Sequence, residues 1–277
     1  MQVLSNRSIV ELKGNDSLSF LQKQTTNDLT KHDYCYTYIL SNLGRYLFDF
    51  FCYKINNDHL IIDIDSNQVQ NLMRKLNFYK LRANTQIATS DDYTVFYSRK
   101  DYLSQINQDN IKYIKTYPDP RSRLLGFRSI IPSHCLKNLS LSCQDTMLSE
   151  DKYEHAIPDG TDLFYDKSIP LEYGAQQLHA IDFDKGCYIG QEVMSRVKYQ
   201  GVIRKKIFKV IANEDLAHLS KGISITDSKN DIIGIFCSAY KNQGIALINE
   251  EKKLIDCTRF LIKDMEIRLE VPKWRLN

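Results

Sequence analysis

The chain has 277 residues, of which 43% are hydrophobic and 26% are charged, and its formal net charge is +3. This length allows one large domain or two to three small ones, with enough apolar residues for a packed core. The small net charge gives no argument from composition for a nucleic-acid-binding or membrane-binding protein. The first residues lack the apolar stretch of a signal peptide, and the apolar runs are far too short to cross a bilayer. We therefore expect a cytoplasmic protein with no membrane partner.

The first hundred residues have the patterns of an α+β domain. Val3–Leu12 predicts a strand, and Asp16 is placed to cap a helix over Ser17–Gln24. Apolar residues at helical spacing from Val69 to Leu76 predict an amphipathic helix whose apolar stripe packs into the core. Alternating or β-branched runs predict further strands at Thr37–Leu40, Tyr46–Ile55, Leu60–Asp65, Gln86–Thr89 and Tyr93–Tyr97.

The second half of the chain changes from loops to short strands. Asp119–Arg121 and Leu124–Arg128 predict a turn that leads into a strand, and a loop-rich region follows up to about residue 190. After Gly201, turn clusters separate five strand-like runs, which predicts a small C-terminal β-barrel. These runs are Ile207–Ile211, Ile223–Thr226, Ile232–Cys237, Ile245–Asn249 and Met265–Glu270. We expect two domains, residues 1–200 and residues 201–277.

The seven cysteines give no sign of a metal site built by this chain alone. They include no CxxC pair and no zinc-finger grouping with histidine. Their odd number and wide spacing favour reduced thiols. Cys52 and Cys237 stand in apolar runs and are expected to be buried.

Cys187 is different, because it stands between two glycines in the segment Lys185–Glu192, KGCYIGQE. Glycines on both sides indicate a shaped loop, in which we expect the thiol to be exposed. The ammonium group of Lys185 would favour the thiolate, which is the form that attacks electrophiles and binds metals. Cys187 is therefore a candidate nucleophile, metal ligand or redox-sensitive thiol, and Lys185 its candidate activator. The alternatives are a cysteine that fills a turn and a solvated surface lysine.

Lys185–Glu192 is similar to the KGCYxGQE signature of the YgfZ-type folate-binding family, whose members are relatives of the glycine-cleavage T protein. Phe20–Asp28 resembles the FLQxQxTND segment of that family, Asp119–Arg121 its DPR and Pro170–Glu172 its PLE. Gly201–Lys206 is close to the GVIRKR of the branch that assembles iron–sulfur clusters in alphaproteobacteria and mitochondria. The resemblance thus extends over nearly the whole chain.

The resemblance implies a three-lobed, aminomethyltransferase-like α+β fold that binds folate and ends in a β-barrel. It implies tetrahydrofolate or a derivative as cofactor, and a role in the assembly or repair of iron–sulfur proteins, chiefly those with [4Fe–4S] clusters. Effects on tRNA modification would follow indirectly, and iron–sulfur assembly or client proteins would be the partners. Because such clusters commonly take about four cysteine ligands, Cys187 would need ligands from a partner.

Two places depart from the pattern of the family. Arg7 stands where the bacterial branch carries a tryptophan. Leu60–Asp65 lacks the Asn-Ala pair that precedes the catalytic acid of the T protein, so we do not expect aminomethyl transfer itself. Asp63 and Asp65 are interpreted as strand and turn residues.

A folate site needs walls for the pterin, a carboxylate for its paired N–H donors and cations for its glutamate tail. Glu154 and Glu172 are the candidate carboxylates and Tyr188 is a candidate wall, while Asn27 and its neighbour Asp28 are candidates for the rim. The remaining candidates for cofactor contacts follow Cys187 in the chain: Gly190, Gln191, Glu192, Arg196 and Arg204. The alternatives are surface carboxylates, a core tyrosine, turn capping, and a helix that starts at Gln191 with Glu192 in its first turn.

Two other functions remain open. A tetrahydrofolate-dependent aminomethyl or methyl transferase, or a demethylase, would use the same fold with different chemistry. A tRNA-modification factor would bind nucleic acid through the basic run Arg196–Lys206. Such a run is more often a solvated surface, so we do not expect direct nucleic-acid binding.

Overall fold

The computed structural model describes residues 1–101, 115–138, 146–253 and 259–276, which pack into two compact units. Unit 1 comprises Met1–Leu40, Leu47–Leu148 and His179–Ile189. Unit 2 comprises Ser41–Tyr46, Ser149–Leu178 and Gly190–Asn277. The units are therefore interleaved along the sequence, and the expected division at residue 200 stays a prediction.

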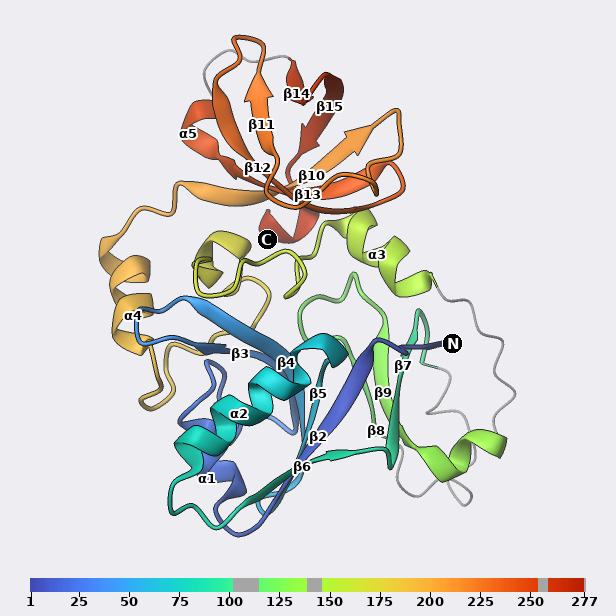
Figure 1. Cartoon of the computed structure of the whole chain (residues 1–277), viewed down its shortest axis with the longest axis vertical. Coiled ribbons are helices and arrows are strands. Elements are labelled where there is room, and N and C mark those ends of the chain that lie inside the picture. Colours follow the sequence, from blue (N-terminus) through green and yellow to red (C-terminus); the bar gives the residue numbers. More distant parts are fainter. Residues whose placement is uncertain (102–114, 139–145, 254–258, 277) are drawn as a thin grey trace. The chain divides into compact units, whose positions relative to one another are not determined.

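A five-stranded antiparallel sheet is the centre of unit 1, with the strand order β3-β4-β5-β2-β6 (Figure 1). Its strands are β2 (Arg7–Lys13), β3 (Tyr34–Leu40), β4 (Tyr46–Asn56), β5 (His59–Asp65) and β6 (Gln86–Ser90). The register pairs Ile9 of β2 with Asp63 of β5. All five strands that the sequence predicted here are present, and β3 begins three residues earlier than expected.

Two helices pack against this sheet, α1 (Ser17–Gln22) and α2 (Val69–Lys80), which follows the short 3-10 turn η1 (Ser66–Gln68). Apolar residues from both helices share one core with the sheet, including Leu21, Leu72 and Leu76. The predicted stripe of α2 is thus confirmed. The prediction that Asp16 caps α1 was wrong, because its carboxylate accepts the backbone N–H of Asn84 at 2.7 Å and makes no capping bond.

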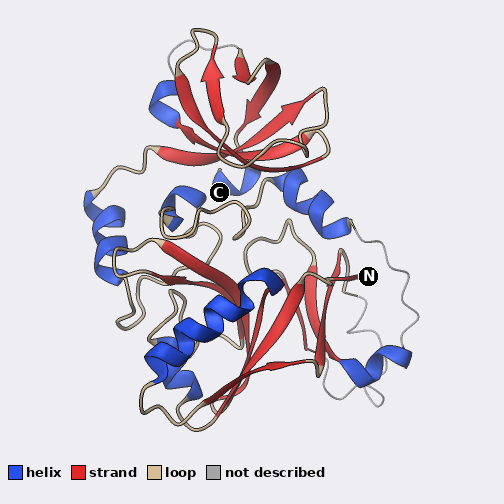
Figure 2. Cartoon of the chain, in the orientation of Figure 1, coloured by secondary structure: helices blue, strands red, loops and turns tan. Residues whose placement is uncertain are grey.

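A smaller antiparallel sheet completes unit 1, with the order β1-β7-β9-β8 (Figure 2). Its strands are β1 (Gln2–Val3), β7 (Tyr93–Ser98), β8 (Lys115–Pro118) and β9 (Phe127–Pro132), and the 3-10 turn η3 (Ser133–Asn138) follows. β9 is the strand expected after the Asp119–Arg121 turn, and it carries the buried Arg128.

Unit 2 contains the predicted C-terminal barrel, a closed sheet with the order β10-β13-β12-β11-β14-β15. Its strands are β10 (Lys205–Ala212), β11 (Ser224–Asp227), β12 (Ile232–Tyr240), β13 (Gln243–Asn249), β14 (Phe260–Ile262) and β15 (Met265–Glu270). Inward residues such as Phe208, Phe236 and Ile248 form its core. Of the six strands, only the short β14 was not expected.

The remaining helices of the described part of the chain are α3 (Met147–His155), η4 (Pro170–Tyr173), α4 (Gln191–Gln200), α5 (Glu250–Lys253) and η5 (Lys273–Arg275). The Trp274 indole in η5 donates hydrogen bonds to the carbonyls of His155 and Ala156, both at 3.1 Å. Gly174 has φ +77°, and a Cβ there would lie 2.4 Å from the Trp274 ring, so only glycine fits. No helix in the described part of the chain is long and apolar enough to cross a membrane.

Candidate functional site

Cys187 is exposed, whereas the four other cysteines within the described ranges are buried. These are Cys35, Cys52, Cys135 and Cys237. Burial raises the pKa of Cys35 to about 12, so that thiol stays protonated at neutral pH. Among the described cysteines, Cys187 is therefore the thiol that a soluble reagent or a partner protein can reach.

Lys185 is not a solvated surface residue, because its ammonium group is enclosed in unit 1. Its role as activator of the Cys187 thiol stays a prediction. Its Nζ donates to three backbone carbonyls: Gln22 at 2.7 Å, Thr25 at 2.5 Å and Asn27 at 3.0 Å. Three acceptors use all three of its N–H bonds. Burial lowers its pKa to about 8, so the ammonium form still predominates at pH 7. Lys185 thus anchors the segment beside Cys187 to the chain that follows α1.

Further bonds tie the segment 179–185 to residues 26 and 27. The Asn27 amide donates to the carbonyl of Tyr36 at 3.0 Å and to that of His179 at 2.7 Å. The Thr26 hydroxyl donates to the carbonyl of Ala180 at 2.7 Å, and the Asp182 N–H donates to the carbonyl of Thr26 at 3.0 Å. Asn27, expected at the rim of a folate pocket, therefore crosslinks β3 and the segment that carries Cys187.

Asp28 acts as a turn residue next to this anchor. Its Oδ1 accepts from the Gln22 amide at 2.9 Å and from the Thr30 N–H at 2.9 Å. Burial opposes ionisation of Asp28, but these hydrogen bonds and the nearby Lys31 outweigh it and lower its pKa to about 2. Lys31 also binds the Asp182 carboxylate at 2.9 Å.

Glycines allow the chain to turn on both sides of Cys187. Apart from its two chain neighbours, no heavy atom lies within 4 Å of a Cβ placed on Gly186, so the space beside the residue that precedes Cys187 is open. Gly190 has φ +85° and precedes α4 directly. Tyr188 is buried, and its ring lies 5.1 Å from the Lys185 ammonium. Cys187 thus has an open flank, while the residues two before and one after it are held inside unit 1.

The start of a helix at Gln191 is confirmed, and Glu192 and Arg196 of this helix bind each other. Their side chains form an exposed (i, i+4) ion pair at 2.9 Å. Arg204 lies before β10 and pairs with Glu251 at 3.4 Å, also in an exposed position. These three side chains therefore have partners of their own on the surface of unit 2.

The two candidate carboxylates lie in separate places within unit 2. One oxygen of Glu154 accepts from Lys209 at 3.1 Å and from Gln243 at 3.0 Å, which lowers the pKa of Glu154. Glu154 thus has partners for one of its oxygens within unit 2, and its role in folate binding stays a prediction. Glu172 lines a crevice of about 50 Å³ beside Trp274, and its role in folate binding stays a prediction. Burial raises the pKa of Glu172.

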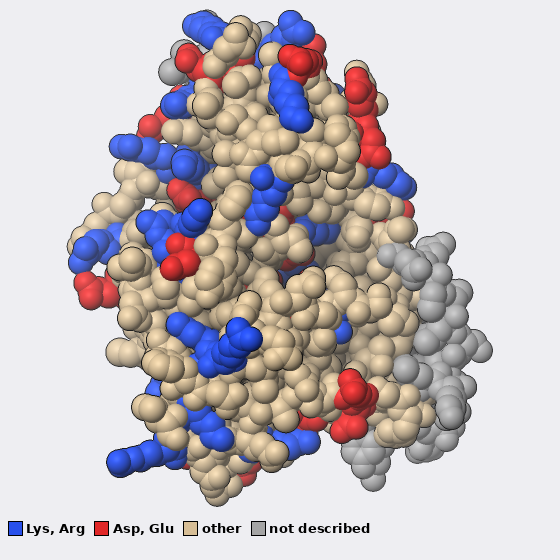
Figure 3. Space-filling view, in the orientation of Figure 1, with Lys and Arg blue, Asp and Glu red and all other residues tan. Residues whose placement is uncertain are grey.

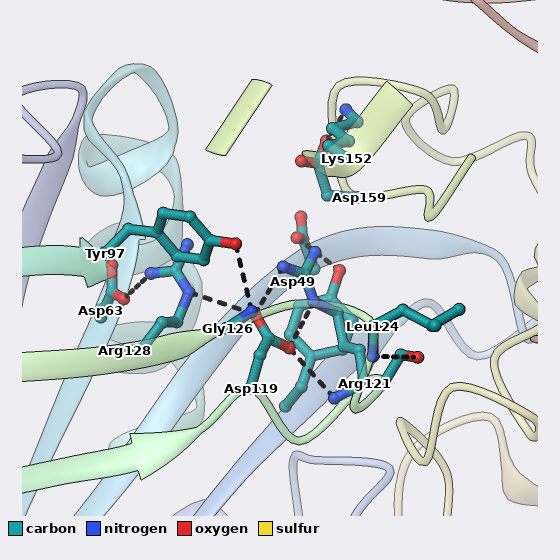
Figure 4. A network of polar contacts seen from close by, with 12 residues as sticks. Asp49, Asp63, Tyr97, Asp119, Arg121, Leu124, Gly126, Arg128, Lys152 and Asp159 are labelled. Carbon is teal, nitrogen blue, oxygen red and sulfur yellow. Dashed lines mark hydrogen bonds and ion pairs between the residues drawn. The ribbon is translucent and has the colours of Figure 1, made fainter. Parts of the chain in front are cut away.

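Sequence reasoning missed a buried ionic network in unit 1 (Figure 4). Asp63 is fully buried, and its carboxylate pairs with Arg7 at 2.5 Å and with Arg128 at 2.6 Å. Asp119 binds Arg121 through both oxygens, at 3.0 and 2.8 Å. Asp63 is a strand residue of β5, as interpreted, but the ionic network around it was not predicted.

Aromatic rings enclose this network. The Arg128 guanidinium lies 3.9 Å from the centre of the Phe51 ring, and that of Arg121 lies 5.1 Å from the centres of both Phe51 and Tyr36. The Tyr36 hydroxyl donates to Asp49 at 2.7 Å. One signal was present in the sequence, because an aspartate inside the apolar run Leu60–Ile64 needs a buried cation.

The described residues contain no group of three or more His, Cys, Asp or Glu that would hold a metal ion. In this part of the molecule Cys187 therefore does not belong to such a group. A metal or cluster bound through its thiolate would need ligands from outside.

Comparison with known proteins gives two findings. The chain is similar to proteins named iron–sulfur cluster assembly factor IBA57 homolog, mitochondrial. The identity is 30% over 235 residues for that of Coccidioides immitis and 30% over 256 residues for that of Dictyostelium discoideum. Each match covers 75% of this chain but only 55% and 61% of the relative, so the chain spans little more than half the length of these relatives. No family model matches the sequence.

The second finding concerns the fold. The crystal structure of the glycine cleavage system aminomethyltransferase T from Bartonella henselae superposes with a TM-score of 0.72. The superposition covers 98% of this chain and 85% of that protein, and the sequences are 12% identical. The chain therefore has an aminomethyltransferase-like α+β fold with a C-terminal β-barrel, as the sequence resemblance implied, and the similar sequences reported above are named for iron–sulfur cluster assembly.

Proposed function

We propose that this protein assists the assembly or repair of iron–sulfur proteins, chiefly those with [4Fe–4S] clusters, through the thiol of Cys187. The observation that carries the proposal is the exposed thiol with an open flank in a loop anchored through Lys185. The names of the similar proteins support the same role. Cys187 binds iron through its sulfur, while the partner that donates or receives the cluster supplies the other ligands.

Tetrahydrofolate or a derivative is the proposed small-molecule ligand, and the fold shared with an aminomethyltransferase supports it. When bound, it would supply a one-carbon carrier. Glu154 and Glu172 remain the candidate carboxylates for its pterin. Its contacts with the chain, the indirect effect on tRNA modification and the cellular compartment stay predictions.

The test is complementation in cells depleted of their own IBA57-type factor. We expect the parent protein to restore the activity of a [4Fe–4S] enzyme and Cys187→Ser not to restore it. Cys135→Ser is the matched control, because Cys135 is buried and lies in the same unit. Both variants must melt at the temperature of the parent. Full restoration by Cys187→Ser would refute the proposed role of the thiol.

Calorimetric titration with tetrahydrofolate tests the ligand separately. We expect Cys187→Ser and the parent to bind it equally, because the thiol and the folate serve different steps. Heat effects no larger than those of dilution in both proteins would refute folate binding and leave the role of the thiol standing.

A folate-dependent one-carbon transferase is the second candidate, and the TM-score with aminomethyltransferase T favours it. It predicts turnover of an aminomethylated or methylated donor with tetrahydrofolate, and it predicts that Cys187→Ser retains this turnover. The assembly role predicts no such turnover by either protein.

A further inference from the structure

The end of helix α2 carries an exposed apolar and basic surface that the proposed function does not use. We name it the α2 patch. It consists of Phe78 and Leu81 together with the cations Arg74, Lys75, Lys80 and Arg82. Figure 1 shows α2 lying across the five-stranded sheet of unit 1, and Figure 3 shows Lys and Arg side chains over that part of the same face.

The apolar part of the patch faces away from the core. Phe78 is 73% exposed and Leu81 is 87% exposed. Phe78 follows the buried Val69 by nine residues, which is two and a half turns, so it lies on the opposite face of the helix. Its ring meets that of Tyr79 edge-on, with 5.3 Å between the ring centres. The core therefore does not explain why a phenylalanine occupies this position.

Leu81 is held outward by an unusual backbone. α2 ends at Lys80, and Leu81 has φ +44°, a region that costs free energy for a residue with a side chain. Glycine would end the helix here without this cost. A strained backbone that presents an exposed leucine indicates a function for that side chain.

The charges that residues 66–90 carry are all positive. The sequence has four cations and no acidic residue between Asp65 and Asp91. None of the four forms an ion pair with a carboxylate of the described residues, although the Lys75 ammonium lies 4.9 Å from the centre of the Tyr79 ring. The nearby Asp16 carboxylate accepts the N–H of Asn84. The α2 patch therefore presents positive charge that the described structure does not neutralise.

From these observations we infer that the α2 patch binds the surface of a membrane with anionic phospholipids. The cations meet the phosphate headgroups, while Phe78 and Leu81 enter the boundary between headgroups and acyl chains. A stable protein interface needs about 800 Å² from each partner, whereas two apolar side chains offer only on the order of 300 Å². RNA would use the cations and the aromatic ring, but it would gain nothing from Leu81.

This inference differs from the expectation of no membrane partner, which relied on net charge. A chain-wide charge of +3 averages over the acidic and basic regions. The net charge therefore does not reveal that the C-terminal part of α2 and the residues after it carry four cations and no carboxylate.

Co-sedimentation of the full chain with vesicles tests the inference. We expect binding to vesicles of phosphatidylcholine with phosphatidylglycerol and little binding to phosphatidylcholine alone. Lys80→Gln with Arg82→Gln should lower the partition coefficient at least tenfold, and Phe78→Ser with Leu81→Ser should also lower it. The matched controls are Lys229→Gln with Lys273→Gln and the single change Leu43→Ser, which remove exposed side chains elsewhere and should have no effect.

A fluorescent variant tests insertion directly. The emission of Phe78→Trp should move to shorter wavelength on anionic vesicles, since the one native tryptophan, Trp274, is already buried. Unchanged emission, equal binding to both kinds of vesicle, or equal losses in patch and control variants would overturn the inference. Binding of polyuridine that Lys80→Gln with Arg82→Gln abolishes, without vesicle binding, would overturn it in favour of RNA.

Discussion

Replacing Lys185 by methionine tests whether this residue anchors the segment that carries Cys187 or activates the Cys187 thiol. The change removes the ammonium group but keeps a long apolar side chain, so the carbonyls of Gln22, Thr25 and Asn27 lose their shared donor. Three unsatisfied carbonyls cost about 6 kcal/mol at about 2 kcal/mol each. Removing the buried charge returns about 3 kcal/mol, because the pKa of Lys185 falls from 10.5 to about 8. We therefore expect a net destabilisation of about 3 kcal/mol.

The assay is urea unfolding of the parent, of Lys185→Met and of the control Lys23→Met. Lys23 lies at the exposed end of α1, and its replacement should change the free energy of unfolding by less than about 0.5 kcal/mol. The pH dependence gives a second measurement. Between pH 8 and 10.5 the unfolded parent holds a proton on Lys185 that the folded parent has released, so the stability of the parent should rise with pH. Lys185→Met should lack this rise.

The reactivity of the Cys187 thiol distinguishes the anchoring role of Lys185 from the activating role. The side chains that influence the pKa of Lys185 are those of Asp28, Cys35 and Asp182, and Cys187 is not among them. The rate of Cys187 alkylation should therefore have the same pH dependence in the parent and in Lys185→Met, under conditions where both are folded. Slower alkylation in Lys185→Met, with its midpoint at higher pH and without loss of stability, would refute the anchoring role of Lys185 and support the activating role.

Two further predictions concern buried carboxylates of unit 1. Asp63→Asn removes the carboxylate charge that Arg7 and Arg128 both bind and should lower the free energy of unfolding by about 3–5 kcal/mol in urea, whereas the exposed Asp58→Asn should change it by less than about 0.5 kcal/mol. Asp28 has a folded pKa of about 2 against an ordinary 3.8, so it stabilises the fold above pH 4 and loses this contribution, about 2 kcal/mol, as the pH falls through 2. Acid unfolding followed by circular dichroism should show a smaller loss of stability over that range in Asp28→Asn, and an equal loss in both proteins would contradict the assignment.

Local patterns predicted the elements of this fold well, because apolar spacing determines which face of a helix or strand is buried. The stripe of α2 and the strands of the barrel are examples. Glycines on both sides of Cys187 likewise predicted its exposure. In these cases the evidence lies within a few neighbouring residues.

Partners distant in sequence were not predictable in the same way. The carbonyls that bind Lys185 lie about 160 residues before it, and nothing near Lys185 indicates them. Asp63 and Arg128 lie 65 residues apart, and Glu154 and Lys209 lie 55 apart. Their residue types suggested charge chemistry, but only the tertiary fold determines which charge meets which.

The interleaving of the two units has a consequence for the order of folding during synthesis. Met1–Leu40 and Leu47–Leu148 leave the ribosome well before His179–Ile189, the last part of unit 1. Domains commonly fold as they emerge. The carbonyls of Gln22, Thr25 and Asn27, however, have no donor until the Lys185 ammonium group is available. In the newly made chain unit 1 therefore stays incomplete until the segment that carries Cys187 has been synthesised. Docking of that segment then satisfies the carbonyls after α1 and fixes the backbone beside the thiol.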